Sequence, residues 1–591
     1  MPCSGSSSAL RRVLALLLFA VTGAPAADPR QADVVVYGAT AGGVMSAIAA
    51  AKHGANVVLL EPGNHVGGML SGGLGRTDMD RQENVIGGLA LEFFRRVGRH
   101  YGEEVAWTFE PSVAEKVLKE MLAEQKITVE FDRSLRSVEK ENGVLTRILT
   151  TDGSEYRAPV FIDATYEGDL MKAAGVSYAV GREARRLHGE SLAGRREILR
   201  SNHQVNFPIS PWKDGKLLPH ITAEEDLVPT GEGDGKLQAY CFRLCLTDVP
   251  ENRLPVSPPE NYDPADYELL RRCFEVGGEK VNGVLGIKRM PNGKSDVNAG
   301  APISLNLCGA NQDYPDASPE RRKEIWKQHL DWARGLVYFV QNDPSVPEGV
   351  RKKYAPWGLC KDEFTDTGGW PHQMYIREAR RMQGEHVLTQ HDLMKDRRKD
   401  DCIGMAGYNI DIREVQWVSL RTFFFPNAAD ELYMEGYVSQ PVEPWGYSLS
   451  GSASPSQRVS EFARSRLPKQ FRGCFRLLPH GAAIHDRGSS RRNRRRHGCE
   501  VRYPRPQCAD RRTPKKSRRR RTNPPRAVTN LRTLGFYLLP SYVIRRLFMA
   551  LLVPLALIAA ETISPAMTGR IVIREGCFFD TGTDKPFHPL G

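Results

Sequence analysis

The sequence predicts an α/β fold with a parallel sheet in its N-terminal part, and three observations support this. Apolar strands alternate with helical stretches over residues 33–180, as in consecutive βαβ units. Residues 184–400 are more polar and less periodic, which indicates an inserted α+β domain. With 591 residues, the chain is too long for one ordinary hydrophobic core.

The first 27 residues resemble an export signal. Arg11 and Arg12 precede an apolar run at 13–21 that is too short to span a bilayer, and residues 24–26 (APA) fit a cleavage site. We therefore expect residues 1–27 to be a signal peptide and the protein to be exported, either periplasmic or secreted. The arginine pair fits both a general secretory and a twin-arginine signal, so the route stays open. We expect no integral membrane span in the mature chain.

The first βαβ unit carries a nucleotide-binding pattern. Val34–Tyr37 is predicted as a buried strand, Val44–Lys52 as a helix of small residues, and Val57–Leu60 as the second strand. The turn between strand and helix would place backbone amides and the positive end of the helix dipole beside a pyrophosphate. It comprises Gly38, Ala39, Thr40, Ala41, Gly42 and Gly43, with Thr40 where the usual Rossmann pattern has its middle glycine.

The end of the second strand and the segment after it distinguish FAD from NAD. Glu61 follows the turn by about twenty residues, where a carboxylate accepts hydrogen bonds from ribose hydroxyls. Further on, Gly67 and Gly68 would let backbone amides meet the second phosphate, and Ser71 would lie near a flavin ring. A nicotinamide dehydrogenase needs no second glycine cluster. The alternatives are a βαβ unit without a nucleotide and a flexible glycine loop.

A third element, residues 160–175 (VFIDATYEGDLMKAAG), is expected to return to the cofactor. A hydrophobic strand runs into Asp163 and Ala164, and Asp169 follows. Either carboxylate would contact the ribityl or pyrophosphate groups. The alternative for Asp169 is a capping role at the helix that follows.

These segments together resemble a widespread bacterial family of FAD-dependent oxidoreductases. The matching stretches are YGATAGG (37–43), HVGGMLSGGLG (65–75), WTFEPSVAEKVLKEML (107–122), FIDATYEGDL (161–170), AYCFRLCLTD (239–248), WPHQMYIREARRMQGE (370–385) and YNIDI (408–412). The resemblance covers about residues 33–446. It implies a Rossmann-type FAD-binding domain of the glutathione-reductase type, non-covalent FAD and a redox reaction, with a remote likeness to the flavin subunit of heterodisulfide reductase. It implies no particular substrate.

Candidate reacting groups lie in one of these stretches. His372 would move a proton, and Arg377 and Arg380 would hold an anionic or polyhydroxylated substrate. Because a flavin carries out the hydride chemistry itself, the protein needs only one acid/base group. The alternative is a salt-bridged helix in which Glu378 and Glu385 pair with the arginines.

The cysteines indicate no metal site. The 11 cysteines are scattered, and no pair or cluster has the spacing of zinc or iron–sulfur ligands. Cys241 and Cys245 lie in a strand-like run and are interpreted as packing residues. Any iron–sulfur cluster would therefore belong to a redox partner protein.

The C-terminal part differs in character from the rest. Much of the net charge of +12 lies after residue 446, in runs such as 491–496 (RRNRRR), and residues 448–530 nearly lack apolar periodicity. Such a segment is irregular or disordered and usually indicates nucleic-acid binding.

Read one base later with GC-rich codons, however, RRNRRRHG (491–498) becomes the small-residue sequence AATAAAM. The same shift applied from Leu449 onward yields a sequence similar to the family's C-terminal motif.

We therefore predict a frameshift after about Gly446, with residues 447–591 as a non-native tail and a neighbouring gene beginning near Met549. No nucleic-acid partner is then expected; the alternative is a genuine basic tail. The expected domains are an FAD-binding domain (28–183), an inserted substrate domain (184–400) and a return toward the FAD domain (401–446).

The sequence thus predicts an FAD-dependent oxidoreductase that takes a hydride from a small-molecule substrate. The alternatives are a flavoprotein that passes electrons to an iron–sulfur partner, an inactive frameshifted product, and a basic nucleic-acid-binding protein.

Overall fold

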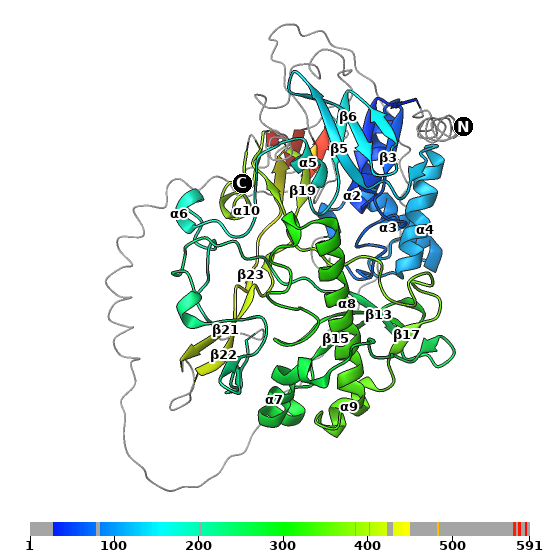
Figure 1. The fold of residues 1–591 in the computed structure, drawn as a ribbon. Helices are drawn as coiled ribbons and strands as arrows, with labels where there is room; N and C mark the ends of the chain where they lie inside the picture. Colours follow the sequence, from blue (N-terminus) through cyan, green and yellow to red (C-terminus); the bar gives the residue numbers. More distant parts are fainter. Residues whose placement is uncertain are drawn as a thin grey trace, which may run out of the picture. The chain divides into compact units, whose positions relative to one another are not determined.

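The computed structural model describes residues 28–77, 83–199, 204–384, 386–400, 402–421 and 430–448, and the backbone of residues 482–483, 571–574, 577–580 and 585–587 (Figure 1). The expected signal peptide, Glu385 and most of the predicted non-native tail lie outside the described residues. No helix in the described ranges is both long and apolar enough to cross a membrane.

The N-terminal part is built on a parallel sheet with the order β25-β8-β2-β3-β4. The strands β2 (Val34–Tyr37), β3 (Val57–Leu60), β4 (Val129–Glu130) and β8 (Val160–Asp163) run parallel, whereas the short β25 (Ala482–Ala483) pairs antiparallel with β8. Parallel neighbours require a crossover, and the helix α2 (Ala41–Lys52) provides it between β2 and β3. The predicted βαβ unit and the predicted α/β fold class are confirmed, but the helix begins at Ala41, three residues before the predicted Val44, because Thr40 caps it.

Both faces of this sheet are buried, which explains why its strands are apolar without alternation. Val34 and Val36 pack in a core with α2, α3 (Gly88–Tyr101) and α4 (Pro111–Glu124), whereas Val35 and Tyr37 pack in a second core on the opposite face. The second core includes α5 (Asp169–Ala173) and a four-stranded sheet of order β1-β7-β6-β5. The strands of that sheet are β1 (Arg30–Gln31), β5 (Leu135–Glu141), β6 (Val144–Thr150) and β7 (Glu155–Arg157).

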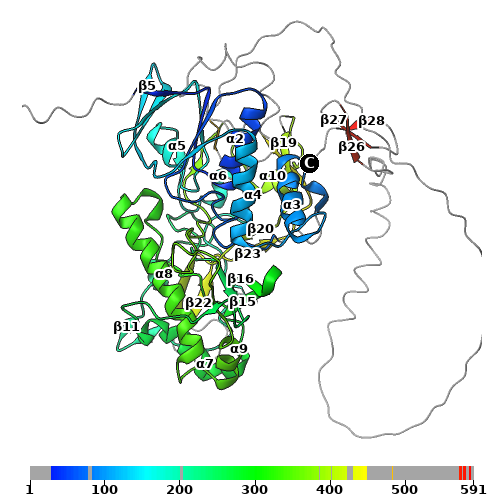
Figure 2. The same ribbon diagram turned by 90° about the vertical axis from the view of Figure 1, so that its right-hand side faces the viewer.

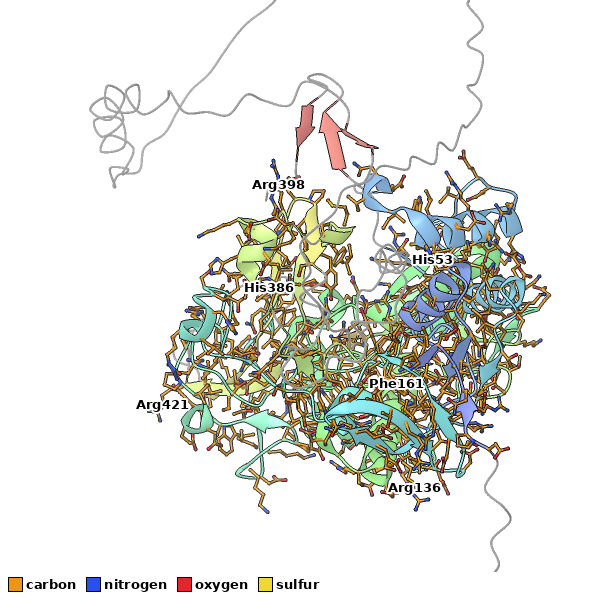
Figure 3. All side chains as sticks on the ribbon, turned by 90° about the horizontal axis from the view of Figure 1, so that it is seen from above. His53, Arg136, Phe161, His386, Arg398 and Arg421 are labelled. Atoms are coloured by element: carbon orange, nitrogen blue, oxygen red, sulfur yellow. The ribbon has the colours of Figure 1, made fainter. Side chains whose placement is uncertain are left out.

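Figure 3 labels Phe161 in β8, which belongs to this second core, and the exposed Arg136 in β5.

The middle of the chain folds as α+β, as predicted. Its five-stranded sheet has the order β14-β17-β13-β16-β15, and every pairing in it is antiparallel. The strands are β13 (Leu244–Thr247), β14 (Arg253–Leu254), β15 (Leu285–Arg289), β16 (Lys294–Ala299) and β17 (Gly358–Cys360). The helices α7 (Glu268–Gly277), α8 (Pro319–Asn342) and α9 (Glu348–Tyr354) share a large core with it. Figures 1 and 2 both show α7 and α9 far from β5, which belongs to the N-terminal part of the chain.

The strands of residues 402–448 pair mainly with one another. β21 (Gln416–Arg421) pairs with β22 (Asp430–Glu435) and with β12 (Ile221–Thr222), β19 (Cys402–Ala406) with β24 (Trp445–Ser448), and β20 (Ile410–Ile412) with β23 (Val438–Gln440). The return of residues 401–446 toward the FAD domain stays a prediction.

Short elements complete the description. They are β9 (Tyr178–Ala179) with β18 (Arg381–Met382), β10 (Trp212–Lys213) with β11 (Lys216–Leu217), and the helices α6 (Arg185–His188), α10 (Gln390–Met394), η1 (Glu83–Val85), η2 (Glu224–Asp226), η3 (Pro264–Tyr267), η4 (Gly278–Lys280), η5 (Pro291–Gly293) and η6 (Tyr314–Asp316). A separate unit, residues 489–587, contains the antiparallel strands β26 (Ile571–Arg574), β27 (Cys577–Asp580) and β28 (Lys585–Phe587).

Candidate functional site

The turn after β2 is held by close backbone packing. Gly38 has φ +99°, and a Cβ there would lie 3.0 Å from the backbone of Ala164 and of Thr165. A Cβ on Gly43 would overlap the carbonyl oxygen of Gly38. These two glycines therefore let α2 begin directly on the end of the strand, as a dinucleotide-binding turn requires.

Thr40, at the position of the missing middle glycine, is the N-cap of α2. Its hydroxyl accepts a hydrogen bond from the Gly43 amide (3.2 Å) and donates one to the Ala164 carbonyl (2.7 Å). Ala41 and Gly42 form the first turn, whose amides have no acceptor inside a helix and suit an anion. The threonine that stands in place of the usual glycine thus links α2 to the segment after β8.

Glu61 lies at the end of β3, beside this turn. Its carboxylate accepts hydrogen bonds from the amides of Ala39 (2.6 Å) and Gly63 (2.8 Å). Burial raises the pKa of the Glu61 carboxyl. Each carboxylate oxygen has two lone pairs, so the group keeps capacity for ribose hydroxyls.

The second glycine cluster packs against the same turn. Gly67 and Gly68 adopt positive φ, and the Gly67 amide donates to the Ala39 carbonyl (2.7 Å). A Cβ on Gly68 would overlap the hydroxyl of Tyr166, which in turn accepts a hydrogen bond from the Met69 amide (2.8 Å). Two predicted cofactor segments therefore meet each other and the segment after β8.

The segment after β8 is fixed by its own carboxylates. Asp163 accepts hydrogen bonds from Thr165 (amide 3.0 Å, hydroxyl 2.7 Å) and from the Met171 amide (2.8 Å), and burial raises its pKa to about 6. Asp169 is in the first turn of α5, after the N-cap Gly168, and its carboxylate accepts from Arg322 and Arg380. Both carboxylates are occupied by internal contacts.

Two stacked histidines lie against the glycine cluster. The rings of His65 and His372 are parallel, with centroids 3.7 Å apart. The nitrogens of His65 contact Glu115 (3.3 Å) and Asp366 (2.9 Å), and its pKa is raised, chiefly by the hydrogen bond to Glu115. His372 lies with its Nε2 3.4 Å from the Ser71 hydroxyl. A histidine whose pKa is raised is thus stacked on one whose pKa is lowered.

His372 has an unused ring nitrogen. Burial, followed by the charge of His65, lowers its pKa to about 4. Its buried Nδ1 has no hydrogen-bond partner among the described residues. The next residue, Gln373, packs so closely that a Cβ on Gly72 would overlap its side chain. A buried, neutral, unpartnered imidazole nitrogen at a glycine-rich segment suits a proton acceptor.

The predicted substrate arginines are engaged within the protein. Arg377 donates to the Ala239 carbonyl (2.9 Å) and to Asn306 (3.0 Å) and stacks over Tyr375. The side chain of Arg380 is 1% exposed and is bound by Asp169 and by carbonyl oxygens of the segment after β8. Arg380 therefore anchors that segment and does not face a substrate.

The salt-bridged helix considered for residues 377–385 is wrong. Only the short strand β18 occurs in the described part of this stretch, and Tyr375 pairs with Cys241 across an antiparallel bridge. One expected pair, Arg381 with Glu378, is present at 3.3 Å. The stretch is tied to the segment before β13 by this bridge and by the hydrogen bond from Arg377 to the Ala239 carbonyl.

Glu167 is a further candidate that the sequence analysis quoted without a role. It accepts a hydrogen bond from the Tyr314 hydroxyl (3.1 Å), and burial, followed by the charge of Asp169, raises its pKa to about 7. His65 and Tyr166 were likewise inside matched stretches and were not singled out. Position in a motif was their only sequence signal, because their partners lie far away in the chain.

Taken together, the residues fit a dinucleotide. The α2 N-terminus offers amides to a phosphate, and Glu61 offers a carboxylate to a ribose, whereas the predicted phosphate contact of the Gly67 amide is taken by the Ala39 carbonyl. Any Cβ at Gly38, Gly43 or Gly68 would meet neighbouring atoms at close range.

Comparison with known protein families agrees with a dinucleotide-binding site. Residues 33–430 match the family model described as FAD dependent oxidoreductase. Solved structures with partial similarity include thioredoxin reductase from T. acidophilum (22% identity, 28% of this chain and 40% of that chain, TM-score 0.17), L-amino acid deaminase from Proteus vulgaris (20%, 27% and 54%, 0.20) and L-proline dehydrogenase from P. horikoshii (14%, 26% and 59%, 0.22). The chain thus spans from 40% to 59% of the length of these proteins.

Proposed function

Because the chain belongs to the FAD-dependent oxidoreductase family, we propose that it oxidises a C–H bond next to a hydroxyl or amine of a small-molecule substrate. FAD, when bound, supplies the hydride acceptor. The observation that carries the proposal is the unpartnered Nδ1 of His372, whose other ring nitrogen, Nε2, lies beside Ser71.

In this mechanism His372 accepts a proton. As the substrate carbon gives up its hydride, the neighbouring O–H or N–H must lose a proton, and the free imidazole nitrogen takes it. His65, whose own pKa is raised, is stacked on His372, and after burial its charge is the next cause that lowers the pKa of His372. That keeps His372 in its accepting form at neutral pH.

The site favours a polyhydroxylated substrate over an anionic one. An anion needs cationic donors, and Arg377 and Arg380 are bound to internal acceptors. Hydroxyl groups need only neutral donors and acceptors, which the imidazole and the backbone provide.

Anaerobic reduction of the FAD-loaded protein tests this. Polyols and sugars, hydroxy acids and amino acids are mixed in turn with the holoprotein, and loss of the oxidised-flavin absorption is followed. We expect one hydroxylated class to reduce the flavin, and His372→Gln to slow this at least about 100-fold with FAD still bound. His329→Gln is the matched control, because His329 is also buried with its pKa lowered to about 4.

Wild-type reduction rates in His372→Gln would overturn the proposal. Reduction only by a reduced iron–sulfur protein would favour the electron-transfer alternative.

We also propose that the protein is exported. The support is the sequence of residues 1–27, with its arginine pair, apolar run and APA site. Fractionation of producing cells, followed by N-terminal sequencing, is expected to give an extracytoplasmic protein beginning near Ala27. An intact Met1 in the cytoplasmic fraction would contradict export.

A further inference from the structure

Two cysteines face each other across neighbouring strands of the inserted sheet. In the antiparallel pairing of β13 with β17, Leu246 is opposite Leu359 and Thr247 is opposite Gly358. The next pair in this register is Cys245 with Cys360, which are 115 residues apart in the sequence. Their Sγ atoms are 3.8 Å apart.

This placement meets the backbone requirement for a disulfide. Directly opposite residues of an antiparallel pair have Cα atoms about 4.5–5.5 Å apart. A disulfide spans Cα separations of about 4.4–6.8 Å. The two sulfurs can therefore bond by side-chain rotation, with the strand pairing intact.

The surroundings of the two thiols are closed and apolar. Both cysteines are 1% exposed and pack in one small cluster with Met290 and Phe364. The pKa of the Cys245 thiol is raised, by its hydrogen bond to Cys360 and then by burial. Such thiols are unreactive in the folded chain, so a bond must form while the strands close and is afterwards shielded from reductants.

The cluster that contains the two cysteines borders the candidate site. Met290 contacts the glycine-rich segment so closely that a Cβ on Gly75 would overlap its sulfur. On the other side of the cluster, the ring of Phe364 packs edge-on against His372 at 5.6 Å. A covalent link here would brace both the glycine segment and the proposed proton acceptor.

We propose that Cys245 and Cys360 form a disulfide when the protein folds under oxidising conditions. The two thiols lose two protons and two electrons and gain one S–S bond. A disulfide oxidant of low molecular weight, such as oxidised glutathione, takes up the electrons and leaves as two thiols. The bond closes a loop of over a hundred residues and restricts the unfolded chain.

The full-length protein refolded in a glutathione redox buffer tests this. It is then unfolded, alkylated without reduction, digested and analysed by mass spectrometry. We expect a cross-linked peptide pair containing Cys245 and Cys360, lighter by two hydrogen atoms than the separate peptides. Cys273, buried in α7, serves as an internal control and should be alkylated completely.

Denaturant unfolding gives a second readout. The oxidised wild type is expected to unfold at a higher denaturant concentration than the same protein refolded with a reductant. Cys245→Ala and Cys360→Ala should each abolish that difference, whereas Cys273→Ala should keep it. Alkylation of Cys245 and Cys360 to the same extent as Cys273 in the oxidised sample would overturn the proposal. Neither readout depends on substrate or flavin, so the outcome is independent of the proposed function.

Discussion

At the scale of single residues, the site shows how burial changes what a charged side chain can do. Arg380 has a 1% exposed side chain and contacts acceptors more than 200 residues away in the sequence, including Asp169. A buried guanidinium needs such partners, because an unpaired buried charge is very costly. His372 is the opposite case, because burial makes it neutral and leaves one nitrogen available.

Glu61 gives the first residue-scale prediction. Glu61→Gln removes the charge and one acceptor oxygen that would meet the ribose hydroxyls. Since hydrogen bonds to charged groups contribute about 1.5–3 kcal/mol, the Kd for FAD should rise about 10- to 100-fold in a fluorescence titration. Glu130→Gln is the control, because that buried carboxylate at the end of β4 is occupied by Tyr156. An unchanged Kd in Glu61→Gln would contradict the assigned ribose contact.

The buried histidines predict a pH dependence of stability. The folded pKa of His329 and of His372 is lowered to about 4, whereas an unfolded histidine titrates near about 6.5. Between these values the unfolded state binds more protons, so stability falls as the pH is lowered through this window, by up to about 3 kcal/mol for each histidine.

Urea unfolding across that pH window checks this for one histidine at a time. The raised pKa values of Asp163 and Glu167 make the folded state more stable as the pH is lowered. The quantity to compare is therefore the difference in the pH dependence of stability between wild type and variant. His329→Gln should remove its share of the pH slope, whereas replacing the exposed His100 should not. Equal slopes in wild type and His329→Gln would contradict the prediction.

At the scale of elements, local patterns were reliable where neighbours in sequence are also neighbours in space. The β2–α2–β3 unit formed as predicted because its strands are apolar and its helix carries small residues against the sheet. The stretch at 377–385 has helical charge spacing, and its described residues 377–384 still form no helix, because Tyr375 pairs with Cys241 and the arginines bind remote acceptors. Tertiary contacts override such spacing.

Thr40 predicts a capping effect on α2. Thr40→Val keeps the shape but removes the hydroxyl that accepts from Gly43 and donates to Ala164, so we expect a loss of about 1–2 kcal/mol in the free energy of unfolding. Thr40→Ser keeps the hydroxyl and should retain most of the stability. Urea unfolding of the three proteins measures this, and equal stability of Thr40→Val and wild type would show that the cap contributes nothing.

At the scale of the whole molecule, buried ion pairs connect segments that no local pattern relates. Lys294 of β16 is 1% exposed and contacts Glu110, which precedes α4, at 2.7 Å and Glu363 at 2.6 Å. Glu363 also accepts hydrogen bonds from Ser112 at the start of α4. The five-stranded sheet and the N-terminal helices thus share one buried polar network, and its hydrogen bonds are complete only when both are in place.

The proposed frameshift is the prediction for the whole chain. Removing one base near the codons for Trp445–Tyr447 should restore the segment that is similar to the family's C-terminal motif. The corrected protein is then expected to retain FAD through gel filtration and to melt at a higher temperature than the chain with its arginine-rich tail. A chain ending at Ser448 should behave like the latter. Equal FAD retention by the corrected and present forms would contradict the frameshift.

By itself, the sequence determined the βαβ unit, the two glycine clusters, the carboxylate at the end of β3 and the family. These depend on residues that lie within about forty positions of one another in the sequence, where apolar strand runs, turn glycines and helix composition act directly. Only the tertiary structure decided that Arg377 and Arg380 are occupied, that His372 stacks on His65, and that Cys245 meets Cys360. Those outcomes depend on burial and on partners over a hundred residues away, and no local pattern encodes which distant side chains will share a core.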